Sequence, residues 1–223
     1  MEDLGKTSEG NTNIGYWEQV LKAPTSAYQE LFDAEKTYLI THIPNSSKVL
    51  DIGCGEGRNM KSILEVTPNV YGVDMDIKAV EDAKENFKDN EGVQVVQGEA
   101  KNLPFEDKSF DVVTLLMILP NLNKDKEAAF KEAARVLRDN GFVIISTFAE
   151  TAFDERMEIY KRLNAPIKKI EGTTVVFDES LGANVSEQFS LEEIENLAQS
   201  SGLTIAEHQK VGLIAYICKL VKK

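Results

Sequence analysis

Five short apolar runs, each followed by a segment of helical character, constrain the fold of this chain more than any other feature. The runs cover residues 48–53, 69–74, 93–98, 110–118 and 141–148. Strands that are apolar along their whole length are typical of a parallel sheet covered on both faces by helices. The alternation therefore predicts an α/β protein with a Rossmann-like, doubly wound sheet.

Apolar residues between the runs recur at helical spacing. One face of the segment after the second run is expected to hold Ile77, Val80, Ala83 or Lys84, and Phe87. In the segment before the fifth run the corresponding residues are Phe130, Ala133, Ala134 and Leu137, and that helix is expected to stop at residues 139–141.

The pattern changes after Phe148. A helix is expected over residues 151–163, then an irregular stretch over 164–188 that contains the strand-like run TTVVF. Ser190 and Glu193 have the spacing of a capping box, and Gly202 is a plausible stop for that helix. Two closing strands near 203–209 and 212–220 are expected to form a hairpin, which makes seven strands with the last one antiparallel.

The expected organisation is a single domain over residues 14–223, preceded by a flexible tail over residues 1–13. Within that domain we expect an N-terminal helical lid at about 14–44, a cofactor-binding core at about 45–149, and a substrate-side insert with the closing strands at about 150–223.

The charge balance restricts the class of partner. The chain carries 25 Lys and Arg against 37 Asp and Glu, a net charge of −12, and its basic residues alternate with acids along the expected helices. Such a field repels polyanions, so nucleic acid is disfavoured as the main partner.

The cysteine content and the N-terminal residues indicate the compartment. The chain has two cysteines, Cys54 and Cys218, and a disulfide at Cys54 would obstruct the glycine-rich turn around it, so a reduced, cytoplasmic setting is expected. The first residues do not resemble a secretory signal, and no apolar stretch reaches membrane-spanning length, so no membrane partner is expected. No metal site is expected, and the oligomeric state is left open.

A glycine-rich turn follows the first strand and presents backbone amides at the carboxyl edge of the sheet, where open α/β folds bind ligands. A tight turn without a ligand would need one glycine, whereas Gly53, Gly55 and Gly57 clear three positions. Nicotinamide dinucleotide sites have the spacing G-x-G-x-x-G, but here Arg58 stands at the third position. With Asp51 before the turn, the D-x-G-x-G-x-G pattern suits a ligand with an amino-acid end and no pyrophosphate.

An acid ends the second strand. Asp74 can accept hydrogen bonds from both hydroxyls of a ribose, while Asp76 is at the start of the next helix and is interpreted as its N-cap. The two strand ends together predict a site for a nucleoside that carries an amino acid.

With these features, the chain resembles the class I S-adenosylmethionine-dependent methyltransferases from about Lys48 to Phe148, and more weakly to its end. The segment VLDIGCGEGRN resembles the family's first motif, and GVDMD resembles the segment that carries its second-strand acid. The stretch that holds the adenine resembles GEAKNLPFEDKSFDVV, and the next helix and strand resemble EAAFKEAARVLRDNGFVIIST. The LPF-x-D-x-SFD pattern further resembles the small-molecule subgroup.

The resemblance implies S-adenosylmethionine as the cofactor. It implies that Asp51 and Gly53 serve the methionine end, Asp74 the ribose, and Glu99 with Ala100 the adenine edge. Many relatives have aspartate in place of Glu99, and the extra methylene changes its reach. The remaining residues assigned to the cofactor site are Cys54, Gly55, Gly57 and Met75.

Further residues near this site are expected to shape the pocket or to pack in the core. Met75 and Ile77 could flank the adenine or serve as ordinary packing. Cys54 is interpreted as a small residue that fits the turn. The wall of the adenine pocket is expected to include Leu103, Pro104 and Phe105, whereas Phe110 is expected in the core.

The methyl group of a sulfonium is already activated, so the enzyme must mainly align an acceptor and exclude water, and no protein nucleophile is needed. No catalytic base is assigned, because His42 and His208 are better explained by surface or packing roles. Relatives often carry a histidine after the fourth strand. This chain has Asn121 there, which could orient an acceptor but cannot take its proton. The segment also lacks the N/D-P-P-Y/F signature of many amide and adenine N-methyltransferases, which disfavours those substrates.

The acceptor site is expected to draw on Tyr16, Trp17 and Tyr28 and on the insert at 164–188. The Tyr-Trp pair could close over the cofactor as a lid or could simply anchor the N-terminus.

These observations favour a methyltransferase that moves a methyl group from S-adenosylmethionine to a small-molecule acceptor. One alternative is a protein that binds S-adenosylmethionine or its product S-adenosylhomocysteine without transfer. Others are a methyltransferase acting on tRNA or protein, and a nicotinamide-dependent reductase. The acceptor atom, its identity and the pathway are not predicted.

Overall fold

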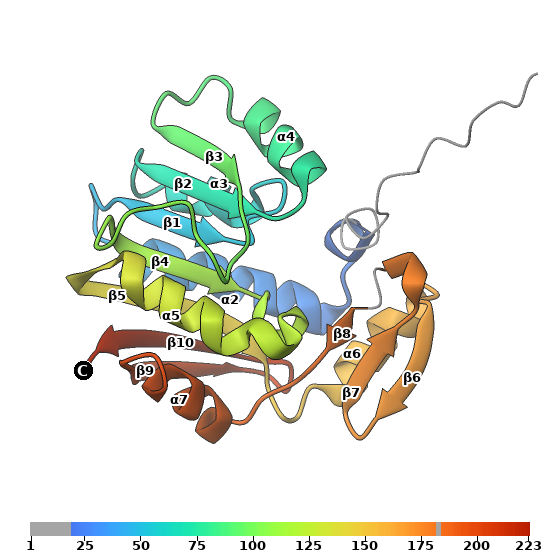
Figure 1. The fold of residues 1–223 in the computed structure, drawn as a ribbon. Coiled ribbons are helices and arrows are strands. Elements are labelled where there is room, and N and C mark those ends of the chain that lie inside the picture. Colours follow the sequence, from blue (N-terminus) through green and yellow to red (C-terminus); the bar gives the residue numbers. More distant parts are fainter. Residues whose placement is uncertain (1–18, 182–183) are drawn as a thin grey trace, which may run out of the picture.

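The computed structural model describes residues 19–181 and 184–223, in which strands and helices alternate through the first two thirds of the chain (Figure 1). The expected tail at 1–13 and the candidate residues Tyr16 and Trp17 lie outside the described residues. The helices are α2 (Ser26–His42), α3 (Arg58–Leu64), α4 (Ile77–Asn86), α5 (Lys126–Val136), α6 (Phe153–Arg162) and α7 (Leu191–Gln199). The strands are β1 (Val49–Ile52), β2 (Val70–Asp74), β3 (Val93–Gln97), β4 (Phe110–Leu116), β5 (Leu137–Phe148), β6 (Ile167–Glu171), β7 (Thr174–Phe177), β8 (Val185–Ser186), β9 (Leu203–Val211) and β10 (Ala215–Lys222).

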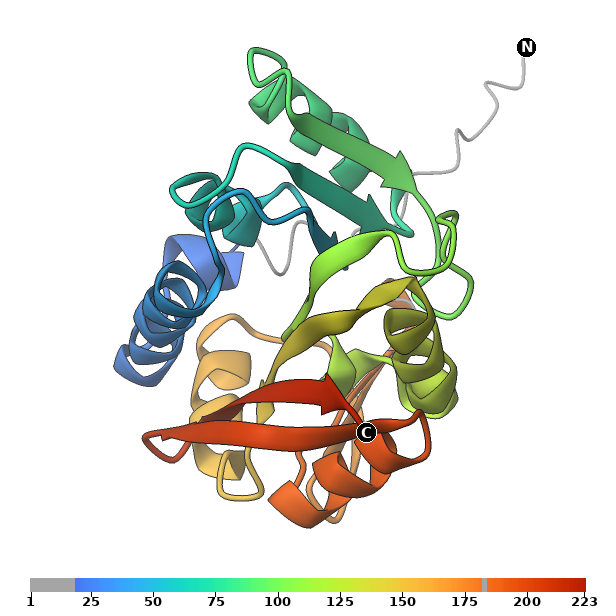
Figure 2. The same cartoon turned by 90° about the vertical axis from the view of Figure 1, so that its left-hand side faces the viewer.

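Seven of the strands form one sheet in the order β3-β2-β1-β4-β5-β10-β9. The first five are parallel, and β10 is antiparallel to both β5 and β9. Figure 2 shows β3 at one edge of the sheet and the β9–β10 hairpin at the other. The predicted Rossmann-like sheet with an antiparallel last strand is confirmed.

Helices cover both faces of the sheet, as the continuously apolar strands require. Helices α2, α3 and α4 bury one set of residues against the sheet, and α5 and α7 bury another set on the opposite face. In Figure 1, α5 and α7 lie in front of the sheet and α2 lies behind it. Within the described ranges, no helix combines the length and apolar character that a membrane span needs.

Local signals in the sequence set several element ends. Asp76 caps α4 by accepting hydrogen bonds from the N–H groups of Lys78 and Ala79, and Ser190 with Glu193 forms the predicted capping box on α7. Both predictions are confirmed, and so is the closing hairpin, in which β9 and β10 pair antiparallel. Ile77, expected on the buried face of α4, is 52% exposed at the first position of the helix, so this part of the prediction is wrong.

Strand β5 begins earlier than the turn-like residues 139–141 suggest. Helix α5 ends at Val136, and Leu137 already pairs with Phe110 of β4. Residues 138–140 are exposed along the extended strand, where Arg138 and Asp139 form ion pairs with Asp111 and Lys108. Pairing with β4 therefore overrides the local turn preference, and the expected stop at 139–141 is wrong.

The stretch at 164–188 is not irregular, because it contains a second, three-stranded antiparallel sheet in the order β6-β7-β8. Val175 and Phe177 of β7 are buried, and Phe177 packs edge to face against Tyr160 of α6 at 5.3 Å between ring centroids. This small sheet lies beyond the carboxyl ends of β1–β4 (Figure 1). The insert therefore borders the edge of the sheet at which the candidate site was predicted.

Candidate active site

The glycine turn between β1 and α3 is the first component of the site. Gly53, Gly55 and Gly57 have φ of +71°, +55° and +95°, conformations that L side chains rarely adopt. A Cβ at Gly53 would lie 2.4 Å from the Ile118 side chain, and one at Gly57 would lie 2.2 Å from Phe87. No atom lies within 4 Å of a Cβ at Gly55, so the middle of the turn presents bare backbone to open space.

The Asp74 carboxylate at the end of β2 lies directly beside this turn. Its Oδ2 accepts a hydrogen bond of 2.9 Å from the Gly55 N–H, and its Oδ1 accepts one of 3.0 Å from the Asp76 N–H. Burial raises the pKa of Asp74, and these backbone donors act in the opposite direction. Each oxygen keeps a lone pair with which it can accept a further hydrogen bond from a ligand hydroxyl.

Asp51 in β1 is a buried acid, 1% exposed, below the turn. Its Oδ1 accepts a hydrogen bond of 2.6 Å from the Thr114 hydroxyl, whereas its buried Oδ2 has no partner. Burial raises the pKa of this carboxyl to about 7, although Thr114 and Arg58 act in the opposite direction. A buried carboxylate oxygen without a donor is costly, so the arrangement fits a cationic ligand group that would supply one.

A recess of about 280 Å³ next to Asp74 is lined by Met75, Gln97, Gly98 and Glu99. Met75 is 72% exposed here, so it is not ordinary core packing. Glu99 is held by Lys101 at 3.1 Å, and Lys101 also contacts Asp125 at 3.0 Å. The structure thus brings together three residues predicted from the sequence: Met75 and Glu99 line the recess, and Asp74 lies next to it. Ala100 follows Glu99 directly in the chain.

The loop after Glu99 is fixed by contacts that the sequence did not indicate. Arg135 of α5 donates hydrogen bonds to the backbone carbonyls of Leu103 and Phe105, and Glu132 accepts one from the Leu103 N–H. The Leu103 side chain is buried in the core, and Phe105 packs edge to face on Phe110 at 5.1 Å. Leu103 and Phe105 therefore support the pocket from the core, rather than lining it as expected.

Another contact missed from the sequence involves Glu35 of α2, which is 1% exposed. Arg58, the first residue of α3, donates to Glu35 Oε2 at 2.6 Å, and the Ser146 hydroxyl donates to Oε1 at 2.5 Å. The one sequence signal was Arg58 itself, a large charged residue at the position where the dinucleotide pattern requires glycine.

Two candidate acceptor residues lie within the described chain. Tyr28, near the start of α2, is buried and packs edge to face on Phe32 and on Phe148 at the end of β5. Asn121 is partly exposed in a short 3-10 helix, Leu119–Asn121, that follows β4. The insert reaches this helix, because the Glu187 N–H donates to the Pro120 carbonyl at 3.1 Å.

Neither histidine reaches this edge of the sheet. His42 ends α2 just before β1 begins, stacks on Tyr38 and contacts Glu207 at 3.3 Å. His208 is in the edge strand β9 and pairs in register with Cys218. Both cysteines are buried and free. Among residues 19–181 and 184–223, His, Cys, Asp and Glu side chains form no cluster suited to a metal ion.

Comparison with known proteins agrees with this geometry. Residues 50–145 match the family model described as a methyltransferase domain. The chain is 34% identical over 132 residues to demethylmenaquinone methyltransferase of Staphylococcus saprophyticus, covering 56% of each protein. It is 34% identical over 131 residues to the same enzyme of Staphylococcus aureus, covering 56% of this chain and 54% of the relative. The chain thus spans about half the length of the curated relatives it matches.

Solved structures extend the likeness to nearly the whole fold. The PH0226 protein of Pyrococcus horikoshii is 26% identical, with a TM-score of 0.70 over 92% of this chain and 99% of that one. The 1,6-didemethyltoxoflavin-N1-methyltransferase of Burkholderia thailandensis, crystallised with S-adenosylhomocysteine, has a TM-score of 0.68 at 17% identity, over 100% and 93% of the two chains. This chain thus has the fold of the S-adenosylmethionine-dependent methyltransferase structures that it resembles.

Proposed function

Because residues 50–145 match the methyltransferase-domain model, we propose that this chain transfers a methyl group from S-adenosylmethionine to a small-molecule acceptor. The observation that carries the proposal is the buried Asp51, whose Oδ2 has no partner. It lies below a turn that leaves open space at Gly55 and beside the Asp74 carboxylate. These groups suit a ligand with an ammonium group and a ribose.

The proposed roles in donor binding follow the order of the strands. Asp51 would receive the ammonium of the methionine end, and Asp74 would accept hydrogen bonds from the ribose hydroxyls. Glu99 and Ala100 would contact the adenine edge, with the exposed Met75 against its face. Gly53, Cys54, Gly55 and Gly57 shape the turn so that the donor can approach the backbone closely.

The electrostatics of the site favour this donor over a dinucleotide. Asp51, Asp74 and Glu99 place three carboxyl groups at the turn and the recess. Ionised carboxylates attract a sulfonium and an ammonium and repel a pyrophosphate. Arg58, the cation nearest the turn, is already paired with Glu35. The site therefore offers a pyrophosphate little compensation.

When bound, S-adenosylmethionine supplies a methyl group on a positively charged sulfur that is ready for displacement. The residues of the chain are left with alignment of the acceptor and exclusion of water, and alignment alone can lower a barrier by about 7–11 kcal/mol. Since both histidines lie elsewhere, the best acceptor is one that is nucleophilic at neutral pH without a protein base.

The acceptor is proposed to enter between the start of α2, the 3-10 helix at Leu119–Asn121 and the insert. Tyr28 and Asn121 would contact it, together with Tyr16 and Trp17 at the proposed lid. The subgroup pattern LPF-x-D-x-SFD and the relatives named for demethylmenaquinone favour a small organic acceptor. The net charge of −12 disfavours tRNA.

Two measurements test the proposal. Calorimetry with S-adenosylhomocysteine and NADH should show binding of the first and not of the second; the reverse result would establish the reductase alternative. Conversion of S-adenosylmethionine should then be followed across a panel of phenols, quinols and heterocyclic amines. Binding without turnover on any acceptor would favour the non-catalytic binding protein.

A further inference from the structure

Glu35 of α2 is a buried carboxylate outside the proposed cofactor-binding residues. It nevertheless connects three elements near them, α2, α3 and β5. Its side chain is 0% exposed, and its oxygens accept from Arg58 of α3 and Ser146 of β5. Burial of an isolated carboxylate is very costly, so both donors are needed to hold it in this place.

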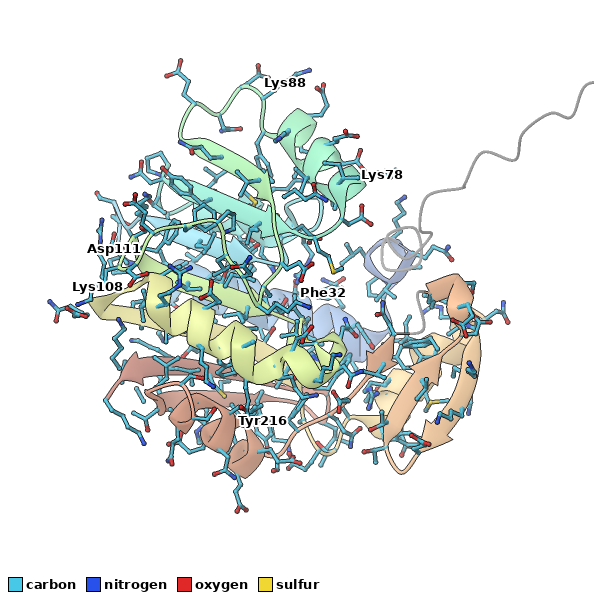
Figure 3. All side chains as sticks on the ribbon, in the orientation of Figure 1. Phe32, Lys78, Lys88, Lys108, Asp111 and Tyr216 are labelled. Carbon is cyan, nitrogen blue, oxygen red and sulfur yellow. The ribbon has the colours of Figure 1, made fainter. Side chains whose placement is uncertain are left out.

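The first arm reaches the glycine turn through Arg58. This residue follows Gly57 directly, and its guanidinium lies 4.5 Å above the ring centre of Phe32 in α2 as well as 2.6 Å from Glu35. Figure 3 shows Phe32 toward the carboxyl ends of the strands, whereas Lys108 and Asp111 lie near their other ends. Helix α2 thus holds the start of α3, and with it the end of the turn, by both charge and stacking.

The second arm reaches the segment after β4 through Ser146. The Met117 N–H donates to both the carbonyl and the hydroxyl of Ser146, at 3.0 Å each, and the hydroxyl in turn donates to Glu35. Met117 has φ of +59°, a strained conformation for a residue with a side chain. The next residue, Ile118, fills the space beside Gly53. The second arm therefore ends where the glycine turn meets the acceptor-side helix that holds Asn121.

We propose that Glu35 is a positioning residue that fixes the donor-binding turn relative to the acceptor-side segment after β4. The inference rests on the proposed methyl transfer for its meaning, but the mechanical link is a property of the fold alone. Loss of the Glu35 charge would leave the partly exposed Arg58 without its counter-ion and weaken both arms together.

The structure provides a matched control for this contact. Lys36, the next residue of α2, forms an ion pair of 2.7 Å with Glu65 at the end of α3, and both side chains are about half exposed. This pair joins the same two helices at the surface, where an ion pair contributes little. Glu65→Gln therefore removes an α2–α3 ion pair without touching the buried connection.

The test compares Glu35→Gln and Glu65→Gln with the wild-type chain at a temperature where all three are folded. Glu35→Gln should weaken S-adenosylhomocysteine binding about tenfold in calorimetry, since it removes charge-assisted hydrogen bonds from the turn. It should also speed hydrogen exchange in residues 116–122, whereas Glu65→Gln should change neither. Wild-type affinity and exchange in folded Glu35→Gln would overturn the proposal.

A pH profile separates positioning from general destabilisation. The groups that face Asp51 are Thr114 from β4, Arg58 from α3, Glu35 from α2 and Asp74 from β2; Arg58 lowers the pKa of Asp51 and Glu35 raises it. Removal of the Glu35 charge should move the pH at which S-adenosylhomocysteine affinity is half lost to a lower value. An unmoved midpoint in a variant that has lost affinity would overturn the proposed connection to the donor site.

The test of Glu35 can still be decided if the proposed function fails or if the Glu35→Gln variant does not fold. If the wild-type chain binds no S-adenosylhomocysteine, the proposed function fails, and the exchange comparison at 116–122 still decides the role of Glu35. If Glu35→Gln does not fold, Arg58→Lys keeps the charge but loses the guanidinium fork. That variant should bind the ligand several-fold more weakly, and unchanged affinity would overturn the proposal.

Discussion

The Oδ2 atom of Asp74 lies 2.9 Å from the backbone nitrogen of Gly55 and accepts its hydrogen bond. The acid that ends β2 and the middle of the turn that follows β1 therefore form one continuous surface, although 19 residues separate them. A second backbone bond, from the Asp76 N–H, fixes the other oxygen. Two motifs that the sequence presents separately are thus held in one orientation before any ligand arrives.

The first prediction concerns this acid. Asp74→Ala should weaken S-adenosylhomocysteine binding by roughly 10- to 100-fold in calorimetry, because it removes charge-assisted bonds worth about 1.5–3 kcal/mol. Asp76→Ser is the control, since serine still caps α4 and the residue is assigned no ligand contact. Equal affinity in Asp74→Ala and the wild-type chain would exclude the assigned role in ribose binding.

The second prediction uses two glycines with similar positive φ angles. Gly55 and Gly172 have φ of +55° and +61°, and neither would bring a Cβ within 4 Å of another atom. Alanine at either position should cost about 1–2 kcal/mol of stability through the left-handed backbone. Only Gly55→Ala should also weaken S-adenosylhomocysteine binding, because its Cβ would enter the donor space. Similar affinities for the two variants would show that the donor does not approach the turn.

The third prediction follows from the raised pKa of Asp51, about 7 against a usual value near 3.9. Between these values the folded chain holds a proton that the unfolded chain has lost, so the contribution of Asp51 to stability falls as the pH rises through this window. Asp51→Asn removes that cost. Without ligand, its Tm at pH 8 should exceed the wild-type value by about 2–4 °C, as for a gain of ~1 kcal/mol, and the difference should shrink as the pH falls and vanish below the unfolded pKa, about 3.9.

Ligand binding should respond in the opposite sense. An ionised Asp51 is the form that receives an ammonium, so S-adenosylhomocysteine affinity of the wild-type chain should rise from pH 6 to pH 8, while that of Asp51→Asn should be weak and nearly constant. Asp82→Asn, which changes a partly exposed carboxylate on α4, should reproduce the wild-type profiles. A pH-independent affinity in the wild-type chain would rule out Asp51 as the receptor of the ammonium.

The sequence predicted those parts of the site that lie at the ends of successive strands. Asp51, the glycine turn and Asp74 occupy neighbouring parallel strands, so the topology alone brings them to one edge. Glu35 could not be found in this way, because its partners Arg58 and Ser146 are 23 and 111 residues away and depend on how α2 packs. An acid inside an amphipathic helix gives no local signal that it is buried.

The fold departs from prediction where long-range pairing overrides local preference. Residues 139–141 have the composition of a turn, but Leu137 pairs with Phe110 and continues the strand through them. In the insert, the exposed side chains of β6 hide its strand character, which depends on pairing with the buried β7. Local propensity describes a strand poorly when its partner decides its conformation.

The last prediction tests the support of the adenine side of the site. Arg135 binds the carbonyls of Leu103 and Phe105 and the carboxylates of Glu132 and Asp107, so one side chain fixes the loop that begins at Glu99. Arg135→Met should lower the Tm by about 2–6 °C, as for a loss of ~1–2 kcal/mol, and speed hydrogen exchange over residues 99–107. Affinity for S-adenosylhomocysteine should fall several-fold, because Glu99 and Ala100 would lose their fixed position.

Arg138→Met is the control, since Arg138 pairs with Asp111 at the surface and contacts only the end of this loop through the Lys108 carbonyl. Its free energy of unfolding should change by less than ~0.5 kcal/mol, and its Tm should stay correspondingly close to that of the wild-type chain. If Arg135→Met accelerates exchange over 99–107 without loss of affinity, the adenine contact does not depend on this loop, and the assignment of Glu99 and Ala100 to the cofactor site is wrong.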